Sequence, residues 1–182
     1  MNLIQCRLPG LLIIEPKVFG DARGFFMETW NQQRYRQAGL DATFVQDNLS
    51  FSRRGALRGL HFQNPAPQGK LLSVLEGEVF DVAVDLRRGS PTFGKWEATV
   101  LSSQNKRQFF VPAGFAHGFL VLSEEAMFYY KCTEFYSPKD EMTIRWDDPE
   151  IGIEWPDKKP ILSEKDARGL RLREVPKERL FA

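Results

Sequence analysis

The 182-residue sequence has few of the side chains that build disulfide frameworks and metal sites: two cysteines and two histidines. Cys6 and Cys132 are far apart in the chain, so they make neither a disulfide framework nor a zinc-ligand spacing. Small barrels that bind iron or manganese usually supply three or four ligands, and two histidines would need a carboxylate to complete such a site. We therefore expect no bound metal.

Long apolar runs and an excess of one charge are also absent. No apolar run reaches about 18 residues, and the first ten residues show no basic-then-apolar signal segment, so we expect no membrane span. The unpaired cysteines fit a reducing cytoplasm. Because 25 Lys and Arg balance 24 Asp and Glu, we expect no nucleic-acid partner. At this length we expect a single domain over residues 1–182.

The sequence does contain many short strand-like runs between turn signals. The clearest is KLLSVLEGEVFDVAVDLR (70–87), in which Glu-Gly-Glu predicts a tight turn. After that turn, residues alternate with a period of two, so Val79 and Phe80 begin sets that lie on opposite faces of a sheet. Further runs cover residues 10–16, 24–30, 42–52, 57–63, 95–101, 107–113, 117–122 and 126–136.

Only two short stretches have helical character. NQQRYRQAG (31–39) ends in a glycine suited to a C-cap, and SEKDARG (163–169) begins with a serine suited to an N-cap. We expect the C-terminal segment, about 163–182, to be helical or extended. Many short strands with few helices predict an all-β sandwich or barrel. Such a barrel is open at its mouth, where a small ligand can bind.

The two histidines, His61 and His117, lie in strand-like runs. In LRGLHFQ (57–63), alternation places His61 on one face and Arg58 on the other. His61 is either a hydrogen-bonded core or rim residue or a general base, because an imidazole with a pKa of about 6.5 can take a proton at neutral pH. His117 follows a Pro-Ala-Gly turn and is either a turn residue or a ligand contact. Nearby, Arg58 suits a phosphate, and Lys70 suits a developing oxyanion.

Tyrosines cluster in the segment MFYYKCTEFYSP. Tyr130 and Tyr136 are six residues apart, so within one strand they would face the same way. Packing in the core is the default for such side chains. The functional alternative is a phenol that acts as a general acid, with an unperturbed pKa of about 10.

Together these motifs resemble the dTDP-4-dehydrorhamnose 3,5-epimerases. The resemblance is carried, in order over residues 1–170, by RGFFMETW, FVQDNLSFSRRGALRGLHFQ, GKLLSVLEGEVFDVAVDLRRGSPTFGKW, FVPAGFAHGFLVL, YKCTEFYSPKDE and LSEKD. It implies a cupin-type double-stranded β-helix (jelly roll) with a few short helices, a homodimer and no cofactor. It also implies the substrate dTDP-4-dehydro-6-deoxy-D-glucose, which is inverted at C3 and C5 on the route to dTDP-L-rhamnose.

The resemblance also implies roles for individual residues. His61 would be the base and Tyr130 the acid, Asp166 would pair with His61, and Lys70 would lie near the C4 oxygen. In the family, the segment that corresponds to residues 23–28 reaches the site of the partner subunit. After LSEKD the family often continues with small residues and a proline, whereas this chain reads ARGLRLRE. Contacts with the nucleotide sugar are implied for Arg23, Glu28, Gln46, Asp47, Asn48, Arg58, His117, Phe119, Tyr136, Glu141 and Lys165.

Three other functions fit parts of the sequence. A C3-only or C5-only epimerase acting on a related dTDP-4-keto sugar would share the same base and acid. A metal-dependent cupin enzyme would share the fold. A non-catalytic nucleotide-sugar binding module is disfavoured, because it does not need an acid and a base on opposite sides of a sugar.

Overall fold

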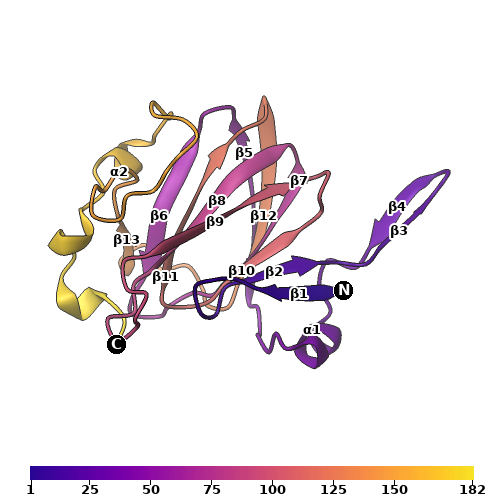
Figure 1. Cartoon of the computed structure of the whole chain (residues 1–182), viewed down its shortest axis with the longest axis horizontal. Coiled ribbons are helices and arrows are strands. Elements are labelled where there is room, and N and C mark those ends of the chain that lie inside the picture. Colours follow the sequence, from indigo (N-terminus) through magenta and orange to yellow (C-terminus); the bar gives the residue numbers. More distant parts are fainter.

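The structure is a computed structural model that describes residues 1–182, and it consists mainly of two antiparallel sheets packed against each other (Figure 1). The first sheet has the strand order β1-β2-β10-β7-β12-β5, and the second has the order β13-β6-β11-β8-β9. Strands β3 and β4 form a separate hairpin that projects from one end of the molecule (Figure 1). The expectation of a jelly roll with few helices is confirmed.

The strands are short, and their bounds follow the turn signals of the sequence. They are β1 Asn2–Gln5, β2 Leu12–Glu15, β3 Val18–Asp21, β4 Gly24–Met27, β5 Gln46–Arg53, β6 Leu57–Gln63, β7 Lys70–Glu76, β8 Glu78–Asp85, β9 Trp96–Ser102, β10 Gln108–Val111, β11 Phe115–Val121, β12 Glu125–Cys132 and β13 Glu141–Thr143. The expected tight turn separates β7 from β8 at Gly77. The run 126–136 was expected to be one strand, but β12 ends at Cys132, so Tyr136 lies in the loop that follows.

The helices lie at the two expected places. In α1 (Gln32–Ala38), the side chain of Asn31 accepts a hydrogen bond from the Arg34 amide, and Gly39 adopts a left-handed conformation that ends the helix. Helix α2 (Glu164–Ala167) is capped by Ser163. Two 3-10 turns follow, η1 (Leu172–Glu174) and η2 (Lys177–Arg179). None of the helices has the length and apolar character needed to cross a membrane.

Apolar side chains are buried in three clusters. One lies between the two sheets and includes Leu72, Val79 and Phe128. The second lies on the other face of the second sheet, where Val82 and further residues of β8 pack with the C-terminal segment. The third packs Tyr35 of α1 with residues of β2 and β7. The alternation along β8 therefore places its two sets of side chains on opposite faces, as the sequence predicted.

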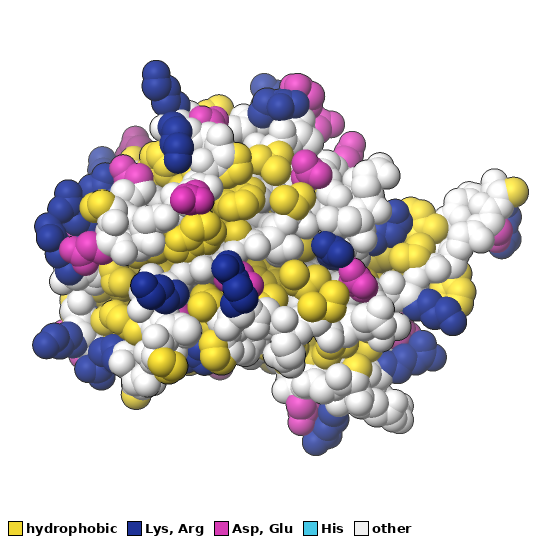
Figure 2. Space-filling view, in the orientation of Figure 1, with side chains coloured by type: hydrophobic (Ala, Val, Ile, Leu, Met, Phe, Trp, Pro, Cys, Tyr) yellow, Lys and Arg dark blue, Asp and Glu magenta, His cyan; other side chains and the backbone are white.

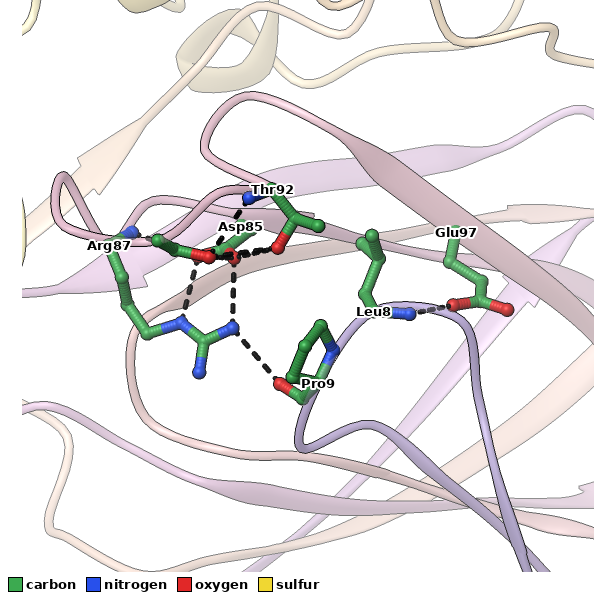
Figure 3. A network of polar contacts seen from close by, with 7 residues as sticks. Leu8, Pro9, Asp85, Arg87, Thr92 and Glu97 are labelled. Carbon is green, nitrogen blue, oxygen red and sulfur yellow. Dashed lines mark hydrogen bonds and ion pairs between the residues drawn. The ribbon is translucent and has the colours of Figure 1, made fainter.

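Two carboxylates, one of them fully buried, join the two sheets at the edge formed by β1, β2 and β9. Asp85, at the end of β8, accepts two hydrogen bonds from the Arg87 guanidinium, at 2.9 and 2.8 Å (Figure 3). The same guanidinium donates to the carbonyl oxygen of Pro9, in the loop between β1 and β2, at 3.0 Å. On β9, Glu97 accepts a hydrogen bond from the Leu8 amide at 2.8 Å. We call this set of contacts the edge clamp.

Asp85 is ionised at neutral pH. Burial on its own would raise the pKa of Asp85. Hydrogen bonds from Arg87, Ser90 and Thr92 outweigh that effect and lower the pKa to about 2. The carboxylate of Asp85 in the edge clamp therefore stays negatively charged at neutral pH.

Candidate active site

A cavity of about 340 Å³ opens between the two sheets, on the side formed by β5 and β6. One wall comes from β5, β7 and β12 of the first sheet, and the opposite wall comes from β6, β11 and β13 of the second. Among the residues predicted from the sequence, the cavity is lined by Gln46, Asn48, Arg58, His61, Lys70, His117, Phe119, Tyr130, Tyr136, Glu141 and Lys165.

His61 projects from β6 and contacts a buried carboxylate behind it. Its Nε2 lies 2.5 Å from Oδ1 of Asp166, which is 3% exposed. Ser163, the N-cap of α2, donates a hydrogen bond to the other oxygen of Asp166 at 2.8 Å. Because an ionised carboxylate only accepts, Nε2 carries a hydrogen and Nδ1 is the nitrogen free to take a proton.

Burial and pairing act in opposite directions on the His61 imidazole. Burial lowers the pKa of His61 below its ordinary value, although hydrogen bonding to Asp166 raises it. Burial would raise the pKa of Asp166, but contacts with His61 and Ser163 lower it overall. At neutral pH we therefore assign His61 as a neutral imidazole beside an ionised Asp166, which is the state a general base requires.

The position of Arg58 differs from what simple alternation predicted. Arg58 and His61 were expected on opposite faces of β6, but both line the cavity. The pairing of β6 with β11 shifts by one residue between these positions, so His117 faces His61 while Phe119 faces Arg58. The expectation of opposite faces was therefore wrong, because strict alternation does not survive a register shift.

Two glycines allow this shift. Gly59 has a φ of +133°, and a Cβ at this position would come within 2.5 Å of the Cα of Gly118 on β11. The two backbones therefore cross at a distance that no larger residue permits. The close crossing turns both Arg58 and His61 toward the cavity.

Lys70 and Tyr130 stand on the wall opposite His61. Burial lowers the pKa of Lys70 and raises the pKa of Tyr130 to about 12. The lysines near the site that form ion pairs are Lys131 and Lys165, whereas Lys70 is not ion-paired with a carboxylate of the protein. The phenol of Tyr130 thus holds its proton at neutral pH, and Lys70 lines the cavity without an ion-pair partner.

His117 lies beside His61 in the adjacent strand β11 and also has a carboxylate partner. Its Nε2 lies 2.9 and 3.0 Å from the two oxygens of Asp81, which is fully buried on β8. Burial raises the pKa of Asp81, and His117 counteracts that effect. The contact fixes the orientation of the His117 ring, which stacks against Phe128 at a centroid distance of 6.1 Å.

Polar side chains join the two sheets at the mouth of the cavity. Lys165 donates to Glu141 at 2.9 Å, and the hydroxyl of Tyr136 donates to the same carboxylate at 3.0 Å. The backbone N–H of Tyr136 donates to Oε1 of Gln46 at 2.8 Å. Next to it, the side-chain amide of Gln46 donates to Asn48 at 3.0 Å.

Three of the predicted contact residues lie outside the cavity. Asp47 points to the outer face of β5, where it pairs with Lys131 at 2.7 Å. Arg23 lies at the end of the β3–β4 hairpin and pairs with Asp21, while Glu28 pairs with Arg34 of α1. Within one chain these three residues do not line the cavity, so their contact with a ligand stays a prediction.

Several residues of the site were not identified from the sequence. Asp81 was not singled out from the sequence, although a carboxylate on the buried face of an apolar strand is a signal for a polar partner. Ser50, Gln68, Phe128 and Cys132 also line the cavity. Serines and phenylalanines in strands are too common to single these positions out by residue type.

The donor set of the cavity does not resemble a typical metal site. His61 and His117 are neighbours, but each is paired with its own carboxylate. No three or more His, Cys, Asp or Glu side chains are grouped as metal ligands.

Comparison with known proteins agrees with the geometry. The profile of the family described as dTDP-4-dehydrorhamnose 3,5-epimerase matches residues 5–174. The chain belongs to this family. It is 55% identical over 178 residues to the dTDP-4-dehydrorhamnose 3,5-epimerase of Methanothermobacter thermautotrophicus, covering 96% of each chain. It is 57% identical over 171 residues to the enzyme of that name from Shigella flexneri, covering 93% of this chain and 94% of the relative.

A solved structure extends the comparison to three dimensions. The dTDP-6-deoxy-D-glucose-3,5-epimerase of Legionella pneumophila, in complex with dTDP-4-keto-L-rhamnose, superposes with a TM-score of 0.96 and 53% identity. The alignment covers 99% of this chain and 97% of that chain. The protein is thus an isomerase of the epimerase type.

Proposed function

We propose that the cavity binds dTDP-4-dehydro-6-deoxy-D-glucose and inverts it at C3 and C5 to give dTDP-4-dehydro-L-rhamnose. The observation that carries the proposal is the placement of an imidazole and a phenol on opposite sheets. His61 stands on β6 and Tyr130 on β12, with the ammonium of Lys70 on the same wall as Tyr130. A sugar ring between the sheets has the base on one face and the acid on the other.

The reaction needs no external oxidant or reductant, because the ketone at C4 acidifies both neighbouring carbons. Nδ1 of His61 takes the proton from C3 or C5, and the electrons of the C–H bond move onto the C4 oxygen to give an enolate. The Tyr130 hydroxyl then gives its proton to the same carbon from the opposite face. The imidazolium afterwards loses a proton to solvent and the phenolate takes one from solvent, which restores both groups for the second inversion. Inversion follows from this separation of base and acid.

The enolate oxygen requires a positive charge that is already in place. The ammonium of Lys70 is buried and lacks a carboxylate partner, so a developing oxyanion is a favourable neighbour. Asp166 stabilises the imidazolium that His61 becomes after taking the proton. In a cavity from which most water is displaced, both interactions are stronger than in bulk solvent.

The remaining predicted residues are assigned to binding of the nucleotide. The planar guanidinium of Arg58 suits the diphosphate. The amides of Gln46 and Asn48 and the ring of Tyr136 form a flat polar surface near the mouth, which suits the thymine base. In this assignment His117, Phe119, Glu141 and Lys165 surround the sugar and the diphosphate.

We further propose that the protein is a homodimer in which each β3–β4 hairpin reaches the cavity of the partner. The hairpin projects from the sheets (Figure 1) and carries exposed aromatic side chains, with Phe25 61% and Phe26 69% exposed. Hydrophobic side chains are visible on this arm in Figure 2. The outer face of the first sheet is apolar too, since Leu49 and Phe51 of β5 are exposed. Such an area supports association with a second copy.

Mixed dimers test the hairpin contact. We expect Arg23→Ala and His61→Asn each to be nearly inactive alone. In a heterodimer of the two, the hairpin of the His61→Asn subunit serves the intact cavity of its partner. A heterodimer isolated by two affinity tags should therefore regain about half of the wild-type activity, since one of two symmetric sites is complete. Failure to recover a two-tag complex, or a complex as inactive as its parents, contradicts the exchange.

The reaction itself is tested by product analysis in heavy water. Incubation of the protein with dTDP-4-dehydro-6-deoxy-D-glucose should give dTDP-4-dehydro-L-rhamnose with deuterium at both C3 and C5, as measured by NMR. Each inversion exchanges one carbon-bound proton for a solvent deuteron, so the labelled carbons count the inversions. Deuterium at only one carbon would assign a C3-only or C5-only epimerase instead. Substrate that binds without exchange would assign a binding module.

We also propose that residues 1–182 form one domain that works in a reducing compartment, the cytoplasm. The C-terminal segment supports the single domain, because Leu172 and Val175 share a core cluster with β6 and β8. Cys6 and Cys132 are free thiols, as expected for a protein that never meets an oxidising environment.

A further inference from the structure

Ser50 carries a buried hydroxyl that has no hydrogen-bond partner in the protein. Its Oγ is fully shielded, and the only other buried side-chain polar atom in this state is Nε of Arg179. An unpaired buried hydroxyl lowers stability, because it has lost its water without gaining a partner. A ligand that supplies the missing partner would explain why a serine stands here.

Ser50 stands in the wall of the cavity. On β5 it shares the inward face with Asn48 and Ser52, and it lines the cavity. Its neighbour across the strand pair is Phe128 of β12, whose ring offers no lone-pair acceptor. No side chain across this strand pair therefore supplies the missing partner.

Arg58 provides the second observation, because it presents an uncompensated positive charge at the same end of the cavity. Its Nε donates to the hydroxyl of Ser52 at 2.9 Å, and one Nη donates to the carbonyl of Phe51 at 3.2 Å. These contacts hold the guanidinium against β5 and leave other N–H groups of the fork unused. Since Ser52 is two residues from Ser50, the anchored guanidinium and the free hydroxyl are about 7 Å apart along the strand.

We propose that Ser50 is a substrate-binding residue that donates a hydrogen bond to a diphosphate oxygen of the nucleotide sugar, beside Arg58. The two phosphates of a diphosphate span this separation, so one phosphate oxygen accepts from the hydroxyl while another balances the charge of the guanidinium. A sugar hydroxyl would satisfy Ser50 but leave the charge of Arg58 unpaired. The inference rests on the proposed function, because it takes the nucleotide sugar as the occupant.

Replacement of Ser50 by alanine separates binding from stability. We expect Ser50→Ala to bind dTDP about 10-fold to 100-fold more weakly, the usual effect of losing one hydrogen bond to a charged group. Binding of thymidine, which has no phosphate, should be unchanged. The melting temperature of the free protein should be equal or higher, because an unpaired polar atom has been removed. KM should rise with kcat kept within a few-fold.

Two further variants serve as controls. Ser50→Cys keeps nearly the same volume but replaces the hydroxyl by a weak donor, so it should weaken dTDP binding like alanine even if Ser50→Ala folds poorly. Ser123→Ala removes a hydroxyl that accepts from the Glu78 amide at 2.8 Å and donates to the Glu125 carbonyl at 2.6 Å, away from the cavity. It should lower the melting temperature and leave dTDP binding unchanged.

The possible failures are distinguishable. If wild-type protein binds dTDP and both Ser50 variants bind it equally well, the role of Ser50 is overturned while the proposed function stands. If the Ser50 variants lose thymidine and dTDP binding equally, or lose kcat with dTDP affinity intact, the hydroxyl faces another part of the ligand and the inference is wrong. If wild-type protein binds neither compound, the proposed function fails as well.

Discussion

Replacement of His61 by asparagine should abolish turnover and leave substrate binding largely intact. Asparagine retains an amide near Asp166 but cannot take a proton from carbon, and loss of a general base typically costs about 10²-fold to 10⁴-fold or more. Steady-state turnover and dTDP affinity, measured on the same preparation, test the prediction.

A readout that a merely structural role would not change is exchange with solvent. The His61→Asn protein should incorporate no deuterium into recovered substrate, while its melting temperature stays close to that of the wild type. Turnover within a few-fold of the wild type would remove His61 from the role of base. A large drop in dTDP affinity would show instead that the imidazole mainly binds.

Replacement of Tyr130 by phenylalanine should uncouple proton exchange from inversion. The base still removes the proton, so deuterium should still enter the recovered substrate from solvent. Without the phenol, no acid stands on the opposite face, and inversion should fail at one carbon or both. NMR in heavy water distinguishes label with retained configuration from label with inverted configuration.

The Tyr130→Phe variant also tests whether the acid on the first sheet and the base on the second act in separate steps. Tyr130 is partly buried and its hydroxyl donates to no protein group, so the ring can be kept while the acid is removed. A Tyr130→Phe protein that epimerised at the normal rate would assign the acid to water or to another residue. Loss of both exchange and inversion would mean that the phenol also supports the step carried out by His61.

The strands of this protein were predictable because their signals are local. Run 57–63 coincides with β6, and the turn near Gly77 divides β7 from β8 as expected. The caps at Asn31, Gly39 and Ser163 are also readable from sequence, since each depends on one side chain or one φ angle. Very short strands such as β13 were missed, because three residues carry too little pattern.

The cavity was less predictable because it depends on contacts between strands far apart in the chain. The resemblance brought His61 and Asp166 together, yet the alternation rule put Arg58 on the wrong face. The cause is the register shift at Gly59, which requires a glycine on the facing strand and is invisible in a single segment. Ser50 could not be predicted from its local sequence either. What sets it apart is that its hydroxyl has no hydrogen-bond partner and that its neighbour across the sheet is a phenylalanine.

The edge clamp affects how far the two sheets can move relative to each other during catalysis. The base His61 and the acid Tyr130 are carried by different sheets. Both can reach the same sugar ring only while the distance between the two sheets stays nearly constant. Asp85 and Glu97 fasten the loop that holds Pro9 to the second layer, on the side remote from the opening. The two sheets are thus fastened at the margin remote from the opening, and we expect this to limit changes in the spacing between His61 and Tyr130.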